Sequence, residues 1–132
     1  GAYVAGQMIK AMLKRRIQVN GARVLVLGLT FKENCPDLRN TRVVDVVGEL
    51  REYGAVVDVH DPWADAGDAR AAYDLDLIAE PEEGAYDGII LAVAHDAYRT
   101  AGAAHLRGFG SAQHLFCDMK SVFAKDASDL RL

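Results

Sequence analysis

The sequence predicts an α/β fold in which helices cover both faces of a parallel sheet. Two apolar runs, residues 24–27 and 88–94, contain no polar side chain, which is typical of strands buried on both faces. Helical patterns alternate with the strands, and this order is typical of parallel strands joined by right-handed crossovers. We therefore predict a single domain, residues 19–132, with a doubly wound, Rossmann-like parallel sheet.

Residues 2–18 have the pattern of a helix that precedes this domain. Apolar residues recur at intervals of three and four positions and form one stripe: Ala5, Met8, Ile9 and Met12. No Ser, Thr, Asp or Asn stands before the stripe to cap the helix. We expect residues 1–18 to be the truncated tail of a helix that links this domain to other parts of a larger protein.

The first half of the domain is expected to contain two strands and one helix. These elements are a strand at 22–28, a polar loop at 29–40, a helix at about 41–53 and a strand at 55–60. The helix has one apolar face, formed by Val43, Val46, Val47 and Leu50. Gly54 is its stop signal, and Asp61-Pro62 ends the second strand.

The second half is expected to contain two further strands. Its elements are a short helix near 65–73, some extended chain at 75–78, a strand at 88–94, a helical stretch at about 97–107 and a strand at 114–118. The last dozen residues have no clear pattern. We expect them to be loosely attached.

Composition narrows the range of partners. The net charge of −4 argues against a broad electrostatic contact with nucleic acid. No apolar run is long enough to span a bilayer, so no membrane partner is expected. Cys35 and Cys117 do not make a disulfide framework, and a reducing cytoplasm is the simpler interpretation. No zinc signature is present, so no metal site is predicted.

Polar residues follow each predicted strand at its carboxyl end. They are Thr30 to Lys32, Asp61, His95, and Asp118 with Lys120. The carboxyl ends of parallel strands meet at one edge of a sheet, and open α/β folds bind their ligands there. We expect these side chains to converge on a binding site.

The first strand is followed by Gly28-Leu29-Thr30-Phe31-Lys32-Glu33, which lacks the G-x-G-x-x-G cradle of an ordinary dinucleotide site. Lys32 offers a point charge that can replace the missing amide donors, but without further information a solvated loop lysine is the favoured interpretation of this position. The ring of Phe31 can stack on a base, but packing under the loop is the commoner role of a lone aromatic side chain.

Other candidates also have two interpretations. Arg39 is suited to bidentate binding of a phosphate or carboxylate, and Asp37 either holds it for that purpose or simply forms a local ion pair. Asp61 starts a turn or binds a ribose, and the turn is favoured. His95 is interpreted as structural, with Asp96 as a candidate to fix its tautomer. Cys117 is expected to be an inert core residue.

In combination, five motifs resemble the C-terminal domain of the UDP-glucose/GDP-mannose dehydrogenase family. They are residues 28–32 (Gly-Leu-Thr-Phe-Lys), 36–41 (Pro-Asp-Leu-Arg-Asn-Thr), 61–62 (Asp-Pro), 91–95 (Leu-Ala-Val-Ala-His) and 118–120 (Asp-Met-Lys). The resemblance covers essentially the whole chain. The segment between Lys32 and Thr41 is most similar to bacterial UDP-N-acetylhexosamine 6-dehydrogenases.

The resemblance implies an NAD-dependent enzyme that oxidises the sugar 6-hydroxyl to a carboxylate for surface-polysaccharide precursors. It implies that Phe31 and Lys32 bind the UDP-sugar and that Arg39 reaches the NAD pyrophosphate. Lys120 stands where many relatives have an arginine that contacts substrate, and lysine lacks that bidentate fork. It also implies a homodimer or higher oligomer, and NAD bound mainly by a domain outside this chain.

No catalytic residue is predicted within these residues. The family's nucleophilic cysteine lies in a glycine-rich middle region, and neither Cys35 nor Cys117 has that setting. The chain alone is therefore expected to bind substrate without turning it over. Two alternatives are a non-catalytic scaffold and a receiver-like signalling module, but strand one does not end in the acidic residues that a receiver needs.

Overall fold

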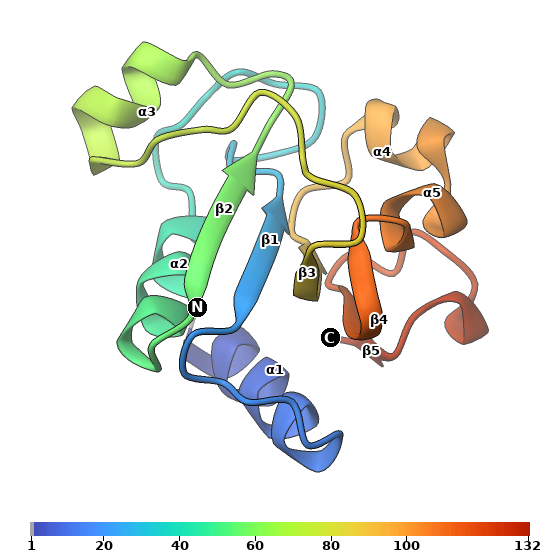
Figure 1. Ribbon diagram of the computed structural model, residues 1–132. Helices are drawn as coiled ribbons and strands as arrows, with labels where there is room; N and C mark the ends of the chain where they lie inside the picture. The colour runs from blue at the N-terminus through green and yellow to red at the C-terminus, as the bar shows by residue number, and fades with distance from the viewer. Residues whose placement is uncertain (1) are drawn as a thin grey trace.

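The computed structural model describes residues 2–132, which form one five-stranded sheet in the order β2-β1-β3-β4-β5 (Figure 1). The strands are β1 (Arg23–Leu27), β2 (Val56–His60), β3 (Tyr86–Leu91), β4 (Gly110–Asp118) and β5 (Leu130–Arg131). Every pairing between neighbouring strands is parallel. The predicted doubly wound, Rossmann-like sheet is confirmed, with one strand more than the sequence indicates.

Helices cover both faces of the sheet (Figure 1). On one face, α1 (Ala2–Lys14) and α2 (Val43–Glu52) contribute to the same core as Val24 and Val26 of β1. On the other, α4 (Asp96–Ala101) and α5 (Ala103–Arg107) share a core with Leu25 and Leu27. Successive side chains of a strand point to opposite faces, so the continuous apolar run of β1 supplies both cores.

The helices α1 and α2 bury the stripes that their sequence periodicity predicts. The buried residues are Ala5, Met8, Ile9 and Met12 in α1, and Val43, Val46, Val47 and Leu50 in α2. The prediction that the first helix extends to residue 18 is wrong. α1 ends at Lys14 because Arg16 has a left-handed φ of 60°, and the chain then turns so that Ile17 is buried.

The connections between β2 and β4 follow the prediction with one change. α3 (Ala66–Tyr73) begins where Asp65 accepts a hydrogen bond from the N–H of Asp68, and Leu77 forms a parallel bridge with Val59. The helical stretch expected at 97–107 is divided into α4 and α5 at Gly102, whose φ of 87° cannot continue a helix.

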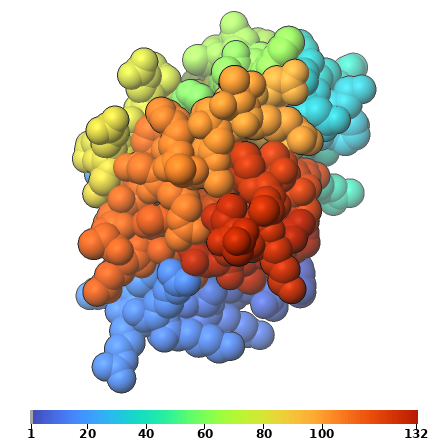
Figure 2. Space-filling model, turned by 90° about the vertical axis from the view of Figure 1, so that its right-hand side faces the viewer, coloured from blue at the N-terminus to red at the C-terminus, as the bar shows by residue number. Residues whose placement is uncertain are grey.

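The expectation that the last dozen residues are loosely attached is wrong. A short 3-10 helix, η1 (Lys125–Ala127), leads into β5, which pairs with the end of β4. Asp129 accepts hydrogen bonds from Arg15 and Arg107, at 2.7 Å each, and from the N–H of Phe116 at 2.9 Å. In Figure 2 the red C-terminal residues accordingly lie between the orange segment and the blue N-terminal segment.

Replacing Asp129 with alanine is expected to destabilise the protein. The substitution leaves two guanidinium groups and a backbone N–H without their acceptor, which costs about 1 to 3 kcal/mol in the free energy of unfolding. Chemical denaturation at pH 7 measures this loss. The exposed Asp126 of η1 provides the control, Asp126→Ala. Equal denaturation midpoints for the two variants would show that the C-terminal segment contributes nothing to stability.

Candidate functional site

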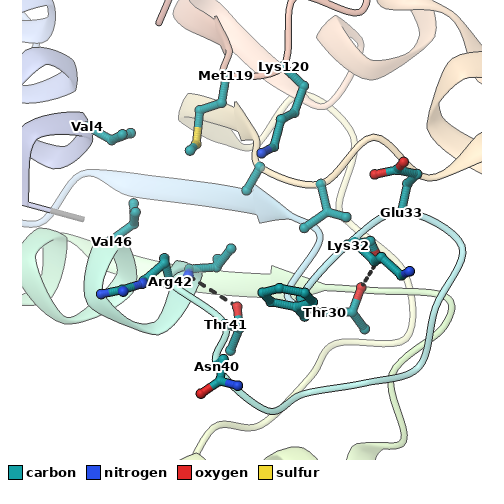
Figure 3. A pocket seen from close by; sticks show the side chains of 14 residues that line it. Val4, Thr30, Lys32, Glu33, Asn40, Thr41, Arg42, Val46, Met119 and Lys120 are labelled. Atoms are coloured by element: carbon teal, nitrogen blue, oxygen red, sulfur yellow. Dashed lines mark hydrogen bonds between the residues drawn. The ribbon is translucent and has the colours of Figure 1, made fainter.

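A pocket of about 350 Å³ opens at the carboxyl ends of the central strands (Figure 3). Residues 30–33 after β1, 92–93 after β3 and 119–120 after β4 line it, together with the first turn of α2 and Val4 of α1. The chain leaves β1 over one face of the sheet and leaves β3 over the other. The pocket therefore lies at the topological switch point, where open α/β sheets bind ligands.

The structure brings Phe31, Lys32 and Lys120 together around this pocket. The two lysines follow different strands, and both are exposed. Phe31 is 56% exposed, so it does not pack under its loop as a lone aromatic side chain usually does. An exposed flat ring beside two ammonium groups is suited to a ligand that combines an aromatic base with an anion.

A further cation at the pocket, Arg42, is not among the residues that the sequence analysis singles out. It directly precedes α2, and Figure 3 shows it on the side of the pocket opposite Lys120. The sequence signal for it is a basic residue that stands just before the apolar stripe of a helix, at the end of the loop that follows β1.

Arg39 lies elsewhere, in a separate hollow that Leu38 and Tyr73 help to line. Its Nε and Nη2 atoms donate to the two carboxylate oxygens of Asp37 at 3.0 and 3.1 Å. The hydrogen bonds from Arg39 lower the pKa of Asp37. The expected ion pair is therefore present, and it leaves the opposite edge of the guanidinium, with Nη1, facing away from Asp37. Arg39 does not share the pocket of Lys32 and Lys120.

The buried carboxylate of Asp61 joins the ends of three strands. Its Oδ2 accepts hydrogen bonds from the N–H groups of Leu29 at 2.6 Å and Thr30 at 3.0 Å, and its Oδ1 accepts one from Trp63 at 2.7 Å. His95 Nε2 lies 3.0 Å from the same Oδ2. Burial opposes the ionisation of Asp61, but these hydrogen bonds outweigh it and lower its pKa to about 2.

His95 holds the loop after β1 from the other side. Its Nδ1 accepts the N–H of Asn34 at 2.9 Å, so the proton must be on Nε2, which faces Asp61. The expectation that Asp96 fixes the tautomer is wrong, because Asp61 has that role and the N–H of Asp96 instead donates to the side chain of Asn34. Asp61 and His95 are architectural, as the sequence analysis favoured.

Gly28, the one glycine directly after β1, has a structural role. Its φ is 99°, and a Cβ atom at this position would lie 2.5 Å from the Cβ of Val93. The glycine is therefore needed where the chain after β1 passes close to the chain after β3. It serves packing between two strand ends rather than the approach of a pyrophosphate.

The remaining polar candidates are also structural. Asp118 is fully buried and accepts the N–H groups of Lys120, Val122 and Phe123, so it fixes the backbone turn that carries Lys120. Cys117 is fully buried, as expected, and burial raises the pKa of its thiol to about 12. With Asp61 and Asp118 both buried and occupied by hydrogen bonds, neither is placed as the exposed phosphoacceptor of a receiver module.

Over residues 2–132, no cluster of His, Cys, Asp and Glu has the arrangement of a metal site. In the same residues, no helix combines the length and the apolar character needed to cross a bilayer. The chemistry that the pocket supports is the binding of an anion by the ammonium groups of Lys32 and Lys120 and the guanidinium of Arg42.

The fold and the pocket define a class of protein, an open α/β domain with a pocket lined by cations at its switch point. Comparison with known families makes the class specific. Residues 25–125 match the UDP binding domain of the UDP-glucose/GDP-mannose dehydrogenase family, and the chain belongs to that family.

Two curated relatives align with all 132 residues of the chain. UDP-N-acetyl-D-glucosamine 6-dehydrogenase from Pseudomonas aeruginosa is 59% identical, and the enzyme of that name from Salmonella typhi is 48% identical. The chain covers 31% of each relative's length.

Solved structures agree on the fold. A UDP-glucose dehydrogenase from Pyrobaculum islandicum matches 98% of the chain with a TM-score of 0.71 and 29% identity, over 29% of its own length. An NDP-N-acetyl-D-galactosaminuronic acid dehydrogenase from Methanosarcina mazei Go1 matches 96% of the chain with a TM-score of 0.79, over 27% of its length, but at 22% identity it supports the fold alone.

Replacing Asp61 with asparagine is expected to lower the free energy of unfolding by about 2 to 3 kcal/mol at pH 7, because an amide presents one of its hydrogens to N–H donors. The folded-state pKa of Asp61, about 2, lies below its ordinary value. Its contribution is therefore complete above about pH 4 and is lost as the pH falls towards 2. Chemical denaturation between pH 7 and pH 2 measures both effects. The Asp61→Asn variant should lose less stability than the parent over that acid range, and parallel curves would contradict this role.

Proposed function

We propose that this chain is the UDP-sugar-binding part of an NAD-dependent nucleotide-sugar 6-dehydrogenase. The observation that carries the proposal is the convergence of Phe31, Lys32 and Lys120 on one pocket at the switch point of a domain from this family. In this proposal, the aromatic ring lies against the uracil, and the two ammonium groups bind the pyrophosphate oxygens.

The proposed reaction is the oxidation of the sugar 6-hydroxyl to a carboxylate in two successive hydride transfers, each to a molecule of NAD, with water as the source of the second carboxylate oxygen. UDP-N-acetylhexosamine is the proposed substrate class, because the two relatives that align over the whole chain are named for UDP-N-acetyl-D-glucosamine. NAD supplies the hydride acceptor when bound. The residues described here position the nucleotide end of the substrate, while the sugar would extend towards the part of the protein outside this chain.

Catalysis is proposed to need that other part. The chain covers less than a third of its relatives' length. Cys117 is buried with a raised pKa, which is the opposite of the exposed thiolate that a nucleophile requires. We therefore infer that residues 1–132 alone bind substrate and do not turn it over.

Arg39 is proposed to contact the NAD pyrophosphate. Asp37 occupies the Nε edge of the guanidinium, and the Nη1 side remains free for a second bidentate partner. The free N–H donors of Arg39 fit the oxygens of a pyrophosphate. Because Arg39 and Lys32 line different hollows, two ligands can bind the same loop. No G-x-G-x-x-G follows β1, so the rest of NAD is proposed to lie on a domain outside this chain.

Residues 1–18 are proposed to be the segment that links the domains, with α1 as the tail of the linking helix, and residues 19–132 are proposed to form the binding domain. Tyr3 and Leu13 of α1 are 67% and 60% exposed, as expected of a helix covered by another part of the protein or by a second copy.

We propose that the whole protein forms a homodimer or higher oligomer in the cytoplasm and acts in surface-polysaccharide precursor synthesis.

Titrating the 132-residue chain with UDP tests binding directly. Nuclear magnetic resonance should show shifts for Phe31, Lys32 and Lys120, whereas Arg39 should remain unshifted. Because the pocket is open and exposed, saturation is expected only at about millimolar UDP. A scaffold domain predicts no specific shift at any concentration, and that result would reject the proposed function.

Kinetics of the full-length protein test the division between the two sites. Lys32→Ala should raise KM for the UDP-sugar about tenfold with little effect on KM for NAD, because it removes one charged contact to the sugar nucleotide. Arg39→Ala should raise KM for NAD with little effect on KM for the UDP-sugar. Initial-rate measurements with each substrate varied separately give both constants, and equal effects of one variant on both substrates would refute the assignment.

A further inference from the structure

We propose that Arg42 binds the phosphate groups of the ligand in the pocket at the switch point. The proposal rests on the proposed function and deepens it. Arg42 would be a third cation at the phosphate site and would bind the phosphates from another side of the pocket. Lys32 and Lys120 extend from loops after β1 and β4, whereas Arg42 extends from the start of α2. Figure 3 shows Arg42 and Lys120 at different sides of the same pocket.

The backbone beneath Arg42 is held firmly. Thr41 is buried, and its hydroxyl donates to the carbonyl of Leu29 at 2.6 Å and accepts the N–H of Val43 at 3.2 Å. Val43 is itself buried in the core. The two neighbours therefore fix the point from which the Arg42 side chain leaves the chain, directly beside the loop that carries Lys32.

The side chain of Arg42, in contrast, is exposed. The ion pairs and side-chain hydrogen bonds found within residues 2–132 include Arg15, Arg23, Arg39, Arg70 and Arg107, but not Arg42. A guanidinium that lines a pocket on a fixed backbone, without an acidic partner in the described chain, has its full set of donors available for a ligand.

The position of Arg42 also disfavours a purely structural role. A helix carries partial positive charge at its N-terminus, so a cation there is unfavourable. Arg42 stands at this end of α2, and its side chain makes no capping hydrogen bond. A bound phosphate would attract the guanidinium and would itself interact favourably with the positive end of the helix dipole. The acidic Asp45 in the first turn of α2 offsets part of this unfavourable charge. A basic residue that breaks a local rule beside a pocket is nevertheless typical of a functional site.

The charge around the pocket fits this ligand. Lys32, Arg42 and Lys120 contribute three positive charges against the single carboxylate of Glu33, although the whole chain has a net charge of −4. A pyrophosphate joined to a nucleoside is an anion of the size and charge that several cations on different sides of a pocket can bind.

The experiment compares Arg42→Gln with Arg51→Gln, a matched control at the far end of the same helix and outside the pocket. Both variants of the 132-residue chain are titrated with UDP and with uridine by nuclear magnetic resonance. Arg42→Gln should raise the Kd for UDP about three- to tenfold, leave the uridine response unchanged and not lower Tm, whereas Arg51→Gln should change none of these. The salt dependence of UDP binding should also weaken in Arg42→Gln.

The outcomes separate this inference from the proposed function. An unchanged Kd for UDP in Arg42→Gln would overturn the role of Arg42 while leaving the proposed function intact. Equal weakening of UDP and uridine would also overturn it, because the residue would then act on the fold or on the base. A parent chain that shows no specific response to UDP would reject both. Arg42→Lys, which keeps the charge and loses the fork, should lie between the parent and Arg42→Gln.

Discussion

The hydrogen bonds to the buried carboxylate of Asp61 hold the backbone on which the pocket is built. Four backbone N–H groups, from the chain after β1 and the turn after β2, point at its two oxygens, and His95 adds a bond from the chain after β3. Buried N–H groups that converge on one point need an acceptor with several lone pairs, and a carboxylate supplies them. A buried charge is tolerated only when its donors are all in place, so the carboxyl edge of the sheet is ordered as a unit.

This arrangement changes how the domain can hold an anion. In a dinucleotide site, backbone N–H groups after β1 would face the ligand. Here the N–H groups of Leu29 and Thr30 are already bonded to Asp61, and Gly28 is committed to the close contact with Val93. The contact with an anion is therefore left to long, exposed side chains such as Lys32. Such side chains lose rotamer entropy on binding, which favours a site that is completed by neighbouring parts of a larger protein.

The sequence predicts those features of the fold and the site that local residue patterns and the order of the elements determine. Apolar runs locate the central strands, and the order of elements alone places Lys32 and Lys120 at one edge. Contacts between residues that are distant in the sequence cannot be predicted from local patterns. The strand β5 has only two residues and depends on Asp129, whose partners include Arg15, 114 positions away. Likewise, the partner of His95 is Asp61, 34 positions away, and not its neighbour Asp96.

The loop between β1 and α2 places its cations in two separate hollows. The N–H of Phe31 donates to the carbonyl of Asp37 at 2.7 Å, so the loop is closed on itself between Lys32 and Arg39. Lys32 lines the pocket at the switch point, whereas Arg39 is turned by Asp37 towards the hollow beside α3. The connection between β1 and α2 thus carries Lys32 and Arg39 to two separate hollows. The proposed division of roles, with Lys32 at the sugar nucleotide and Arg39 at the coenzyme, requires such a separation.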